Sequence, residues 1–262
     1  MSRILLGTQG FSYKDWVGPF YPPGALPADY LAYYARVFHT VELDTTYYRI
    51  PARELVRRWD AETPPAFVFS AKLPKEITHE RMLTDCGTLL SAFVDHMSLL
   101  DRQLGTLVVQ LPPQFKVTEF ERLKVFLRGL PSGFRFAVEV RDRKFLTDEF
   151  FTLLQDHGVA FCVQDLYYMP KAAHVTADFT YIRWMGRRTD VDVFDKIQID
   201  RTERMENWAA LILELPASVQ QVYGYFNNHY AGHSPDSVRQ MAKLLSIELT
   251  QNARKVWTLA SG

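Results

Sequence analysis

The sequence has little cysteine, no net charge and no long apolar segment. Its 262 residues include two cysteines, and thirty Lys and Arg residues balance thirty Asp and Glu residues. This balance removes the simplest electrostatic argument for a nucleic-acid partner or an acidic membrane surface. No apolar run approaches the roughly 20 residues that a transmembrane helix needs, and the first apolar stretch is too short for a signal peptide. We therefore expect no membrane association.

The two cysteines favour free thiols. Neither Cys86 nor Cys162 belongs to a Cys-x-x-Cys motif, and Cys162 lies in the apolar segment 159–163, which has the pattern of a buried strand. One disulfide is arithmetically open, but small buried thiols are typical of reduced cytosolic proteins. We expect a cytoplasmic protein, and the sequence does not decide its oligomeric state.

Several motifs of known chemistry are also absent. No G-x-G-x-x-G or P-loop follows an apolar run, and neither G-x-S-x-G nor H-E-x-x-H occurs. Three histidines, His79, His229 and His233, lie in expected loops, but the spacing of the last two includes Gly232 and lacks helical geometry. We assign no metal ligand, and the cofactor stays unknown.

Short apolar segments recur about every 30 residues, with helical patterns between them. They lie at 4–6, 40–43, 67–71, 107–110, 136–140, 159–163, 179–184 and 222–226. Alternating strands and helices predict parallel pairing with crossover helices. Eight such units in about 250 residues predict an α/β protein, a TIM-barrel-like (β/α)8 fold in one domain over residues 1–262. An open doubly wound sheet is the alternative.

Helix boundary signals separate these segments. Thr118 and Glu121 have the spacing of a capping box, and Thr147 precedes an acidic first turn. A longer helix is expected from about Thr88 to Leu104.

Polar residues share one face near the strand ends. In segment 40–43, Val41 and Leu43 alternate with Glu42. Because the outer face of each barrel strand packs on helices and must be apolar, the polar face points into the barrel or its mouth. The inward set at the C-terminal strand ends is Glu42, Asp44, Lys72, Gln110, Glu139, Arg141, Arg183 and Asn227.

This inward set contains three acids and three bases. Buried charges persist only when they are paired, solvated or used. Two interpretations are open: an ion-pair network that fills the barrel, or an active site, since barrel enzymes place their chemistry at this end.

Characteristic segments occur in order along nearly the whole chain. They are GTQGFSY at 7–13, TVELDTTYY at 40–48, FSAKLP at 69–74, QLPP at 110–113, AVEVR at 137–141, YIR at 181–183, YFNN at 225–228 and GHSP at 232–235. In this order they resemble the YecE-like family, known as domain of unknown function 72. The resemblance implies a TIM-barrel-like fold and site positions, but no reaction. Residues 142–145 and His229 depart from the family pattern at the presumed mouth, so substrate preference could differ.

The candidate catalytic residues are Glu42, Glu139 and Lys72. The two glutamates lie on the second and fifth expected strands and could act as acid and base. The alternative is that each only pairs with a neighbouring cation. Lys72, Arg141 and Arg183 could together clamp a phosphate or carboxylate.

The candidate substrate-binding residues surround this set. Tyr13 and Tyr48 are the mouth aromatics expected to reach a ligand, and amides would orient it. The full set is Tyr13, Asp44, Tyr48, Gln110, Arg141, Arg183, Asn227 and Asn228. We expect a hydrolase or isomerase for an anionic substrate that contains phosphate or a sugar. The alternatives are a non-catalytic module that binds a ligand or nucleic acid, and a metal-dependent nucleic-acid-processing enzyme that acts on a phosphodiester.

Overall fold

A closed barrel of eight parallel strands organises the protein. The computed structural model describes residues 2–170 and 174–249. Each strand pairs with its neighbours in sequence, and β8 pairs with β1 to close the barrel. The strands are β1 (Arg3–Gln9), β2 (Thr40–Leu43), β3 (Val68–Lys72), β4 (Leu104–Gln110), β5 (Arg135–Glu139), β6 (Ala160–Asp165), β7 (Phe179–Trp184) and β8 (Gln221–Phe226). The TIM-barrel-like fold expected from the sequence is confirmed, and the open sheet is excluded.

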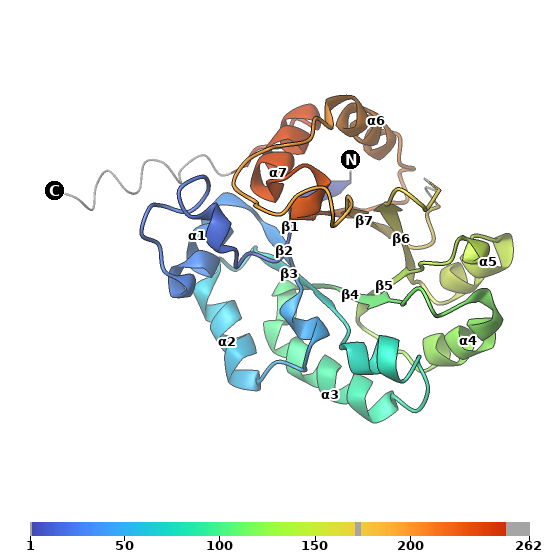
Figure 1. Ribbon diagram of the computed structural model, residues 1–262. Helices are drawn as coiled ribbons and strands as arrows, with labels where there is room; N and C mark the ends of the chain where they lie inside the picture. The colour runs from blue at the N-terminus through green and yellow to red at the C-terminus, as the bar shows by residue number, and fades with distance from the viewer. Residues whose placement is uncertain (1, 171–173, 250–262) are drawn as a thin grey trace.

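Helices cover the outside of the barrel, as Figure 1 shows in a view along its axis. They are α1 (Tyr30–Val37), α2 (Arg53–Glu62), α3 (Gly87–Met97), α4 (Phe120–Arg128), α5 (Asp148–Asp156), α6 (Thr202–Leu213) and α7 (Ser234–Leu244). The connection from β6 to β7 differs from the others, because its described residues, 166–170 and 174–178, contain no helix. The described residues form one α/β domain. The domain was predicted to cover residues 1–262, of which residues 250–262 lie outside the described part.

Two helix boundaries differ from those expected. The capping box at Thr118 does not form, because Thr118 lies inside a 3-10 turn, Val117–Glu119, that precedes α4. The helix expected to reach Leu104 ends at Met97, and a 3-10 segment follows in which Asp101 has a left-handed φ of 45°. Thr147 does cap α5, since its hydroxyl accepts a hydrogen bond from the amide of Phe150 at 3.3 Å.

The core has two separate layers. The larger layer lies between strands and helices and contains outward side chains such as Val41, Leu43 and Val138. The smaller layer fills the barrel and contains Val108 and Ala137 from the opposite strand faces. This alternation is the period of two expected for strands, and it directs the polar residues of the same phase into the barrel.

Both cysteines are buried and free. Cys162 belongs to the layer inside the barrel. Within the described residues, every helix falls short of the length and hydropathy that a bilayer crossing requires.

Gly7 tests how tightly β1 and β2 approach. A Cβ atom at Gly7 would lie 2.1 Å from the backbone oxygen of Thr40, whereas one at Gly87 in α3 would meet nothing within 4 Å. We expect Gly7→Ala to lower the free energy of unfolding by about 1–3 kcal/mol, because the strands must separate. The control Gly87→Ala should leave it unchanged or raise it by up to about 1 kcal/mol. Urea unfolding of both variants measures this, and equal stabilities would contradict the packing described.

Candidate functional site

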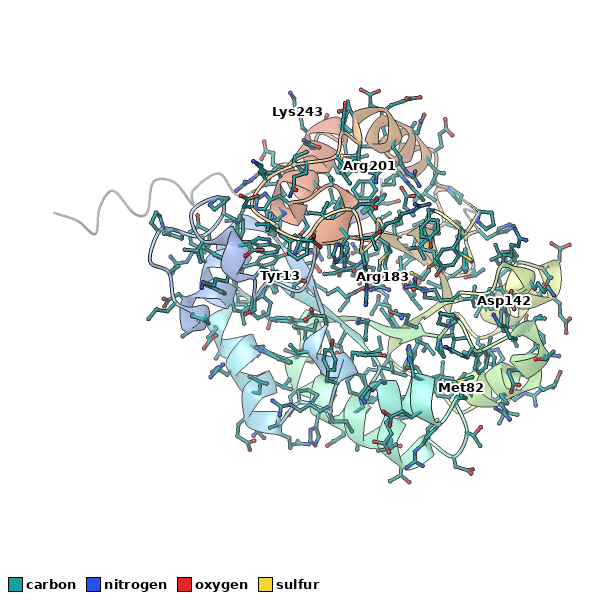
Figure 2. All side chains as sticks on the ribbon, viewed as in Figure 1. Tyr13, Met82, Asp142, Arg183, Arg201 and Lys243 are labelled. Atoms are coloured by element: carbon teal, nitrogen blue, oxygen red, sulfur yellow. The ribbon has the colours of Figure 1, made fainter. Side chains whose placement is uncertain are left out.

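The guanidinium group of Arg183 joins two carboxylates inside the barrel, and Figure 2 labels Arg183 near the barrel centre. Its Nη2 donates a hydrogen bond to Glu42 Oε1 at 2.9 Å, and its Nη1 donates one to Glu139 Oε2. The two glutamates have no exposed surface, and Arg183 is 1% exposed. The sequence predicted these three residues to face one interior, and the structure brings them into direct contact.

Four further side chains contact this cluster, although Nε of Arg183 and Nε of Arg141 have no hydrogen-bond partner among the described residues. Glu139 forms a second ion pair with Arg141, and the hydroxyl of Tyr181 donates to Glu42 Oε2 at 2.6 Å. Arg183 also donates to the amide oxygens of Gln110 at 3.1 Å and Gln9 at 3.3 Å. Two carboxylates thus balance two guanidinium groups. We call Arg183, Glu42, Glu139 and Arg141 the charge cluster.

The charge cluster keeps Glu139 ionised. Burial raises the pKa of Glu139, but the guanidinium groups of Arg141 and Arg183 outweigh burial and lower this pKa to about 2. A carboxylate with so low a pKa holds no proton at neutral pH. Glu139 therefore suits the role of a fixed negative charge that holds two arginines.

A cavity of about 260 Å³ adjoins the charge cluster at the C-terminal mouth of the barrel. We call it the central cavity. Of the predicted site residues, it is lined by Tyr13, Glu42, Asp44, Tyr48, Lys72, Asn227 and Asn228. Gln110, Glu139, Arg141 and Arg183 do not line it. Glu42 belongs to both, so it is the direct link between the charge cluster and the central cavity.

Lys72 and Asp44 line the central cavity outside the charge cluster, and burial shifts the pKa of each. No carboxylate oxygen of the described residues lies within 4.0 Å of Lys72 Nζ, which is 4.9 Å from the centre of the Tyr47 ring. Burial lowers the pKa of Lys72, and the positive charge of Arg183 acts in the same direction. Burial raises the pKa of Asp44, although Lys72 opposes this. Both shifts point toward neutral pH.

Tyr13 and Asn227, which line the central cavity, are both held by hydrogen bonds to Gln9. Tyr13 donates from its hydroxyl to the backbone oxygen of Gln9 at 2.8 Å, and burial raises its pKa. Asn227 donates to the side-chain oxygen of Gln9 at 3.0 Å. Tyr48 is 71% exposed and lies at the entrance.

Asn228 is held by hydrogen bonds to neighbouring buried residues. It is 2% exposed, and its Oδ1 accepts hydrogen bonds from the Trp16 indole at 3.2 Å and from the Ser234 amide at 3.0 Å. Ser234 is the first residue of α7. Asn228 therefore anchors the start of this helix beside the central cavity.

Gln9 is a site residue that the sequence did not reveal. It lines the central cavity and contacts both Arg183 and Asn227. The first strand was expected at 4–6, but β1 continues to Gln9. Extending the alternation from Leu5 through Gly7 would have placed Gln9 on the inward face.

The histidines near the mouth have other partners. His79 is 2.8 Å from the hydroxyl of Thr78, His229 is 3.1 Å from the Val191 oxygen, and His233 is 2.8 Å from Asp236. In the part of the chain that the structure describes, no three His, Cys, Asp or Glu side chains gather as a metal ion would require.

The family model described as "Protein of unknown function DUF72" matches residues 5–258. The chain belongs to the DUF72 family. It is 37% identical to UPF0759 protein YecE of Escherichia coli K12 over 142 residues, which cover 54% of this chain and 50% of that protein. This match therefore spans about half the length of the E. coli relative. UPF0759 protein YunF of Bacillus subtilis is 24% identical, and the match covers 94% of this chain and 95% of that protein.

Solved structures agree with the DUF72 assignment. A DUF72 family protein of Thermotoga maritima superposes with a TM-score of 0.79 and 29% identity, covering 93% of this chain and 99% of its own. A D-psicose 3-epimerase, at 11% identity and a TM-score of 0.53, covers 96% of this chain and 97% of its own. The epimerase shares the fold alone.

Glu139 makes stability depend on acid pH in this DUF72 protein. The pKa of Glu139 is lowered from 4.5 to about 2 in the folded protein. At pH values above the pKa of the unfolded state, the ionised carboxylate therefore adds about 3 kcal/mol to the free energy of unfolding. This contribution is lost as the pH falls from about 4.5 toward 2. We expect Glu139→Gln to lack this pH-dependent loss and to be less stable by about 3–5 kcal/mol at pH 7, because, among the described residues, Arg141 loses its countercharge and Arg183 keeps only Glu42. Urea unfolding from pH 2 to 7 measures both effects.

The matched control is Glu54→Gln, since the Glu54 side chain is 82% exposed on α2. It should preserve the acid dependence and the stability of the wild type. A Glu139→Gln variant as stable as this control at pH 7 would contradict the structural role of the charge cluster.

Proposed function

We propose that the protein is an enzyme that binds a small anionic substrate containing a sugar or phosphate group in the central cavity. It would act by proton transfer, as an isomerase or a hydrolase. One observation supports this most: Asp44 and Lys72 line the same cavity, and their surroundings move both pKa values toward neutrality. Cavity residues whose surroundings move their pKa values toward neutrality are candidates for proton transfer.

The remaining residues of the central cavity would bind and orient the substrate. Lys72 and Arg188 supply positive charge for an anionic group, and Gln9 and Asn227 supply amides for hydroxyl groups. Glu42 would present a carboxylate whose position is fixed by Arg183 and Tyr181. In this scheme Glu139 is a positioning residue, because it pairs with Arg183, and Arg141 in turn pairs with Glu139.

A binding module with all its charges locked is the main alternative. The charge cluster fits that description, but Lys72 does not, because the described residues place no carboxylate within 4.0 Å of its ammonium group. The nucleic-acid-processing alternative has less support, since the formal net charge is zero. We also propose a cytoplasmic location, supported by the two free, buried thiols.

Lys72 separates function from structure without knowledge of the substrate. Removing a functional charge commonly leaves a protein unchanged or makes it more stable by about 0.5–2 kcal/mol. We expect Lys72→Met to behave in this way, because the ammonium group is partly desolvated and lacks a close ion pair. Thermal and urea unfolding measure this. A loss of more than about 1 kcal/mol would assign Lys72 a structural role instead.

Turnover is tested with a substrate panel. The protein is incubated in D₂O with sugars, sugar phosphates and hydroxy acids, and NMR follows deuterium uptake at carbon and the release of hydrolysis products. We expect turnover of at least one compound, reduced by about 100-fold or more in Asp44→Asn and in Lys72→Met. Lys243→Met, at an exposed position of α7, is the control and should keep wild-type turnover. Binding of a compound without turnover would support the binding module.

A further inference from the structure

A second cavity lies beside the central cavity and is rich in arginine. Its volume is about 160 Å³. We call it the arginine cavity; it is lined by Asp165, Tyr167, Gly186, Arg187, Asp190, Arg201, Arg204 and Tyr230. Figure 2 labels Arg201 on the side of α6, away from Arg183 at the barrel centre. The charge cluster contributes none of these residues, so the two features are distinct.

Each guanidinium group of the arginine cavity is held by a neighbour. The guanidinium carbon of Arg187 lies 4.0 Å from the centre of the Tyr167 ring. Nε of Arg201 donates to the backbone oxygen of Tyr230 at 2.9 Å, and its guanidinium lies 5.5 Å from the ring centre of the same tyrosine. The contacts of the half-buried Arg201 order its side chain before a ligand arrives, which lowers the entropy lost on binding, whereas Arg187 and Tyr167 are both exposed.

Arg204 is held more firmly. It forms a two-point ion pair with Asp165, whose Oδ2 also accepts a hydrogen bond from the Trp208 indole at 2.7 Å. Asp165 is 2% exposed, so this pair forms the wall of the cavity.

The charges of the arginine cavity do not cancel. Three arginines face two aspartates, and Asp165 is already engaged by Arg204 and Trp208. Asp190 is exposed at the rim and accepts a hydrogen bond from Thr189 at 3.2 Å. No carboxylate of the described residues lies within 4.0 Å of the Arg187 or Arg201 guanidinium nitrogens. Two guanidinium groups without an ion-pair partner within 4.0 Å are suited to an oxyanion.

The loop after β7 separates the two cavities. Gly186 has a φ of 69°, and a Cβ there would lie 2.0 Å from the His229 backbone oxygen, so the loop contacts the turn after β8 directly. Consecutive residues then face different cavities: Arg188 and His229 line the central cavity, whereas Arg187 and Tyr230 line the arginine cavity. An anion in the arginine cavity would therefore lie next to the central cavity without occupying it.

We propose that the arginine cavity is a binding site for a phosphate-sized oxyanion, held by Arg187 and Arg201. A volume of 160 Å³ leaves room for four oxygen atoms, since one water takes about 30 Å³ in the liquid. The oxyanion is inorganic phosphate or the phosphate group of a monoester. This site does not depend on the proposed catalytic function of the central cavity.

Calorimetric titration of the full chain with inorganic phosphate, at constant ionic strength, tests the site. We expect saturable binding whose Kd rises at least about tenfold in Arg187→Gln and in Arg201→Gln. Arg36→Gln, which removes the same charge from an exposed position of α1, is the control and should bind as the wild type does. Thermal midpoints without phosphate show whether each variant is folded. Absent binding, or equal Kd values in the folded variants, would overturn the proposal.

Lys72→Met separates this site from the central cavity. We expect it to keep the phosphate binding that depends on Arg187 and Arg201, and to lose only phosphate binding that takes place in the central cavity. Phosphate binding that is lost in Lys72→Met but kept in both arginine variants would overturn the arginine cavity and support the central cavity as the anion site. Glycerol 3-phosphate distinguishes the two sources. A Kd lower than that of inorganic phosphate, and dependent on both Arg201 and Lys72, indicates a monoester that reaches the central cavity, whereas a Kd no lower than that of inorganic phosphate indicates free phosphate.

Discussion

The ion pairs of Arg183 with Glu42 and Glu139 are the constraint on which the site depends. The three side chains come from β7, β2 and β5, and none has more than 1% of its surface exposed. Moving such charges out of water costs several kcal/mol for each ion, which close pairing and full hydrogen bonding must offset. A planar guanidinium group can meet this demand, because its fork of donors contacts two carboxylates at once. Among the described residues, removal of Arg183 leaves Glu42 without an ion-pair partner, and removal of Glu139 leaves Arg141 without one.

This arrangement places a buried ion-pair cluster directly beside the central cavity. Hydrophobic residues of similar volume often stabilise a core as well as a buried ion pair does, so the charge cluster is better explained by what it positions. It holds Glu42 between Arg183 and Tyr181 while leaving the residue in contact with the central cavity. Deeper in the barrel, Tyr225 shares hydrogen bonds with Thr40 and Ser70 at 2.7 and 2.8 Å, so the polar order continues below Glu42.

The fold and much of the site could be predicted because strand periodicity is local. Alternation in β2, β5 and β7 placed Glu42, Glu139 and Arg183 on inward faces, and barrel closure then brought them together. Gln9 was missed because Gly7 and Thr8 interrupt the apolar pattern of β1, although the strand continues. The end of α3 was missed because Asp101 adopts a left-handed conformation that its residue type does not require.

The sequence could not predict which charged side chains form ion pairs or how far each is buried. The stagger of strands decides which side chains meet across the barrel, so the sequence could not show that Arg183 contacts both glutamates while Lys72 lacks a close carboxylate. For the same reason it left open whether Glu139 was an acid or a fixed charge. The low pKa of Glu139 follows from two guanidinium groups that reach it from different positions of the chain.

A double-mutant cycle between Glu42 and Arg183 tests the central claim most directly. Urea unfolding is measured for the wild type, Glu42→Gln, Arg183→Met and the double variant, and the coupling free energy is taken from the four values. We expect a coupling free energy of about 1–3 kcal/mol, with the double variant less destabilised than the sum of the two single changes. Additive effects, with a coupling below about 0.5 kcal/mol, would contradict the claim that Arg183 holds Glu42 in place.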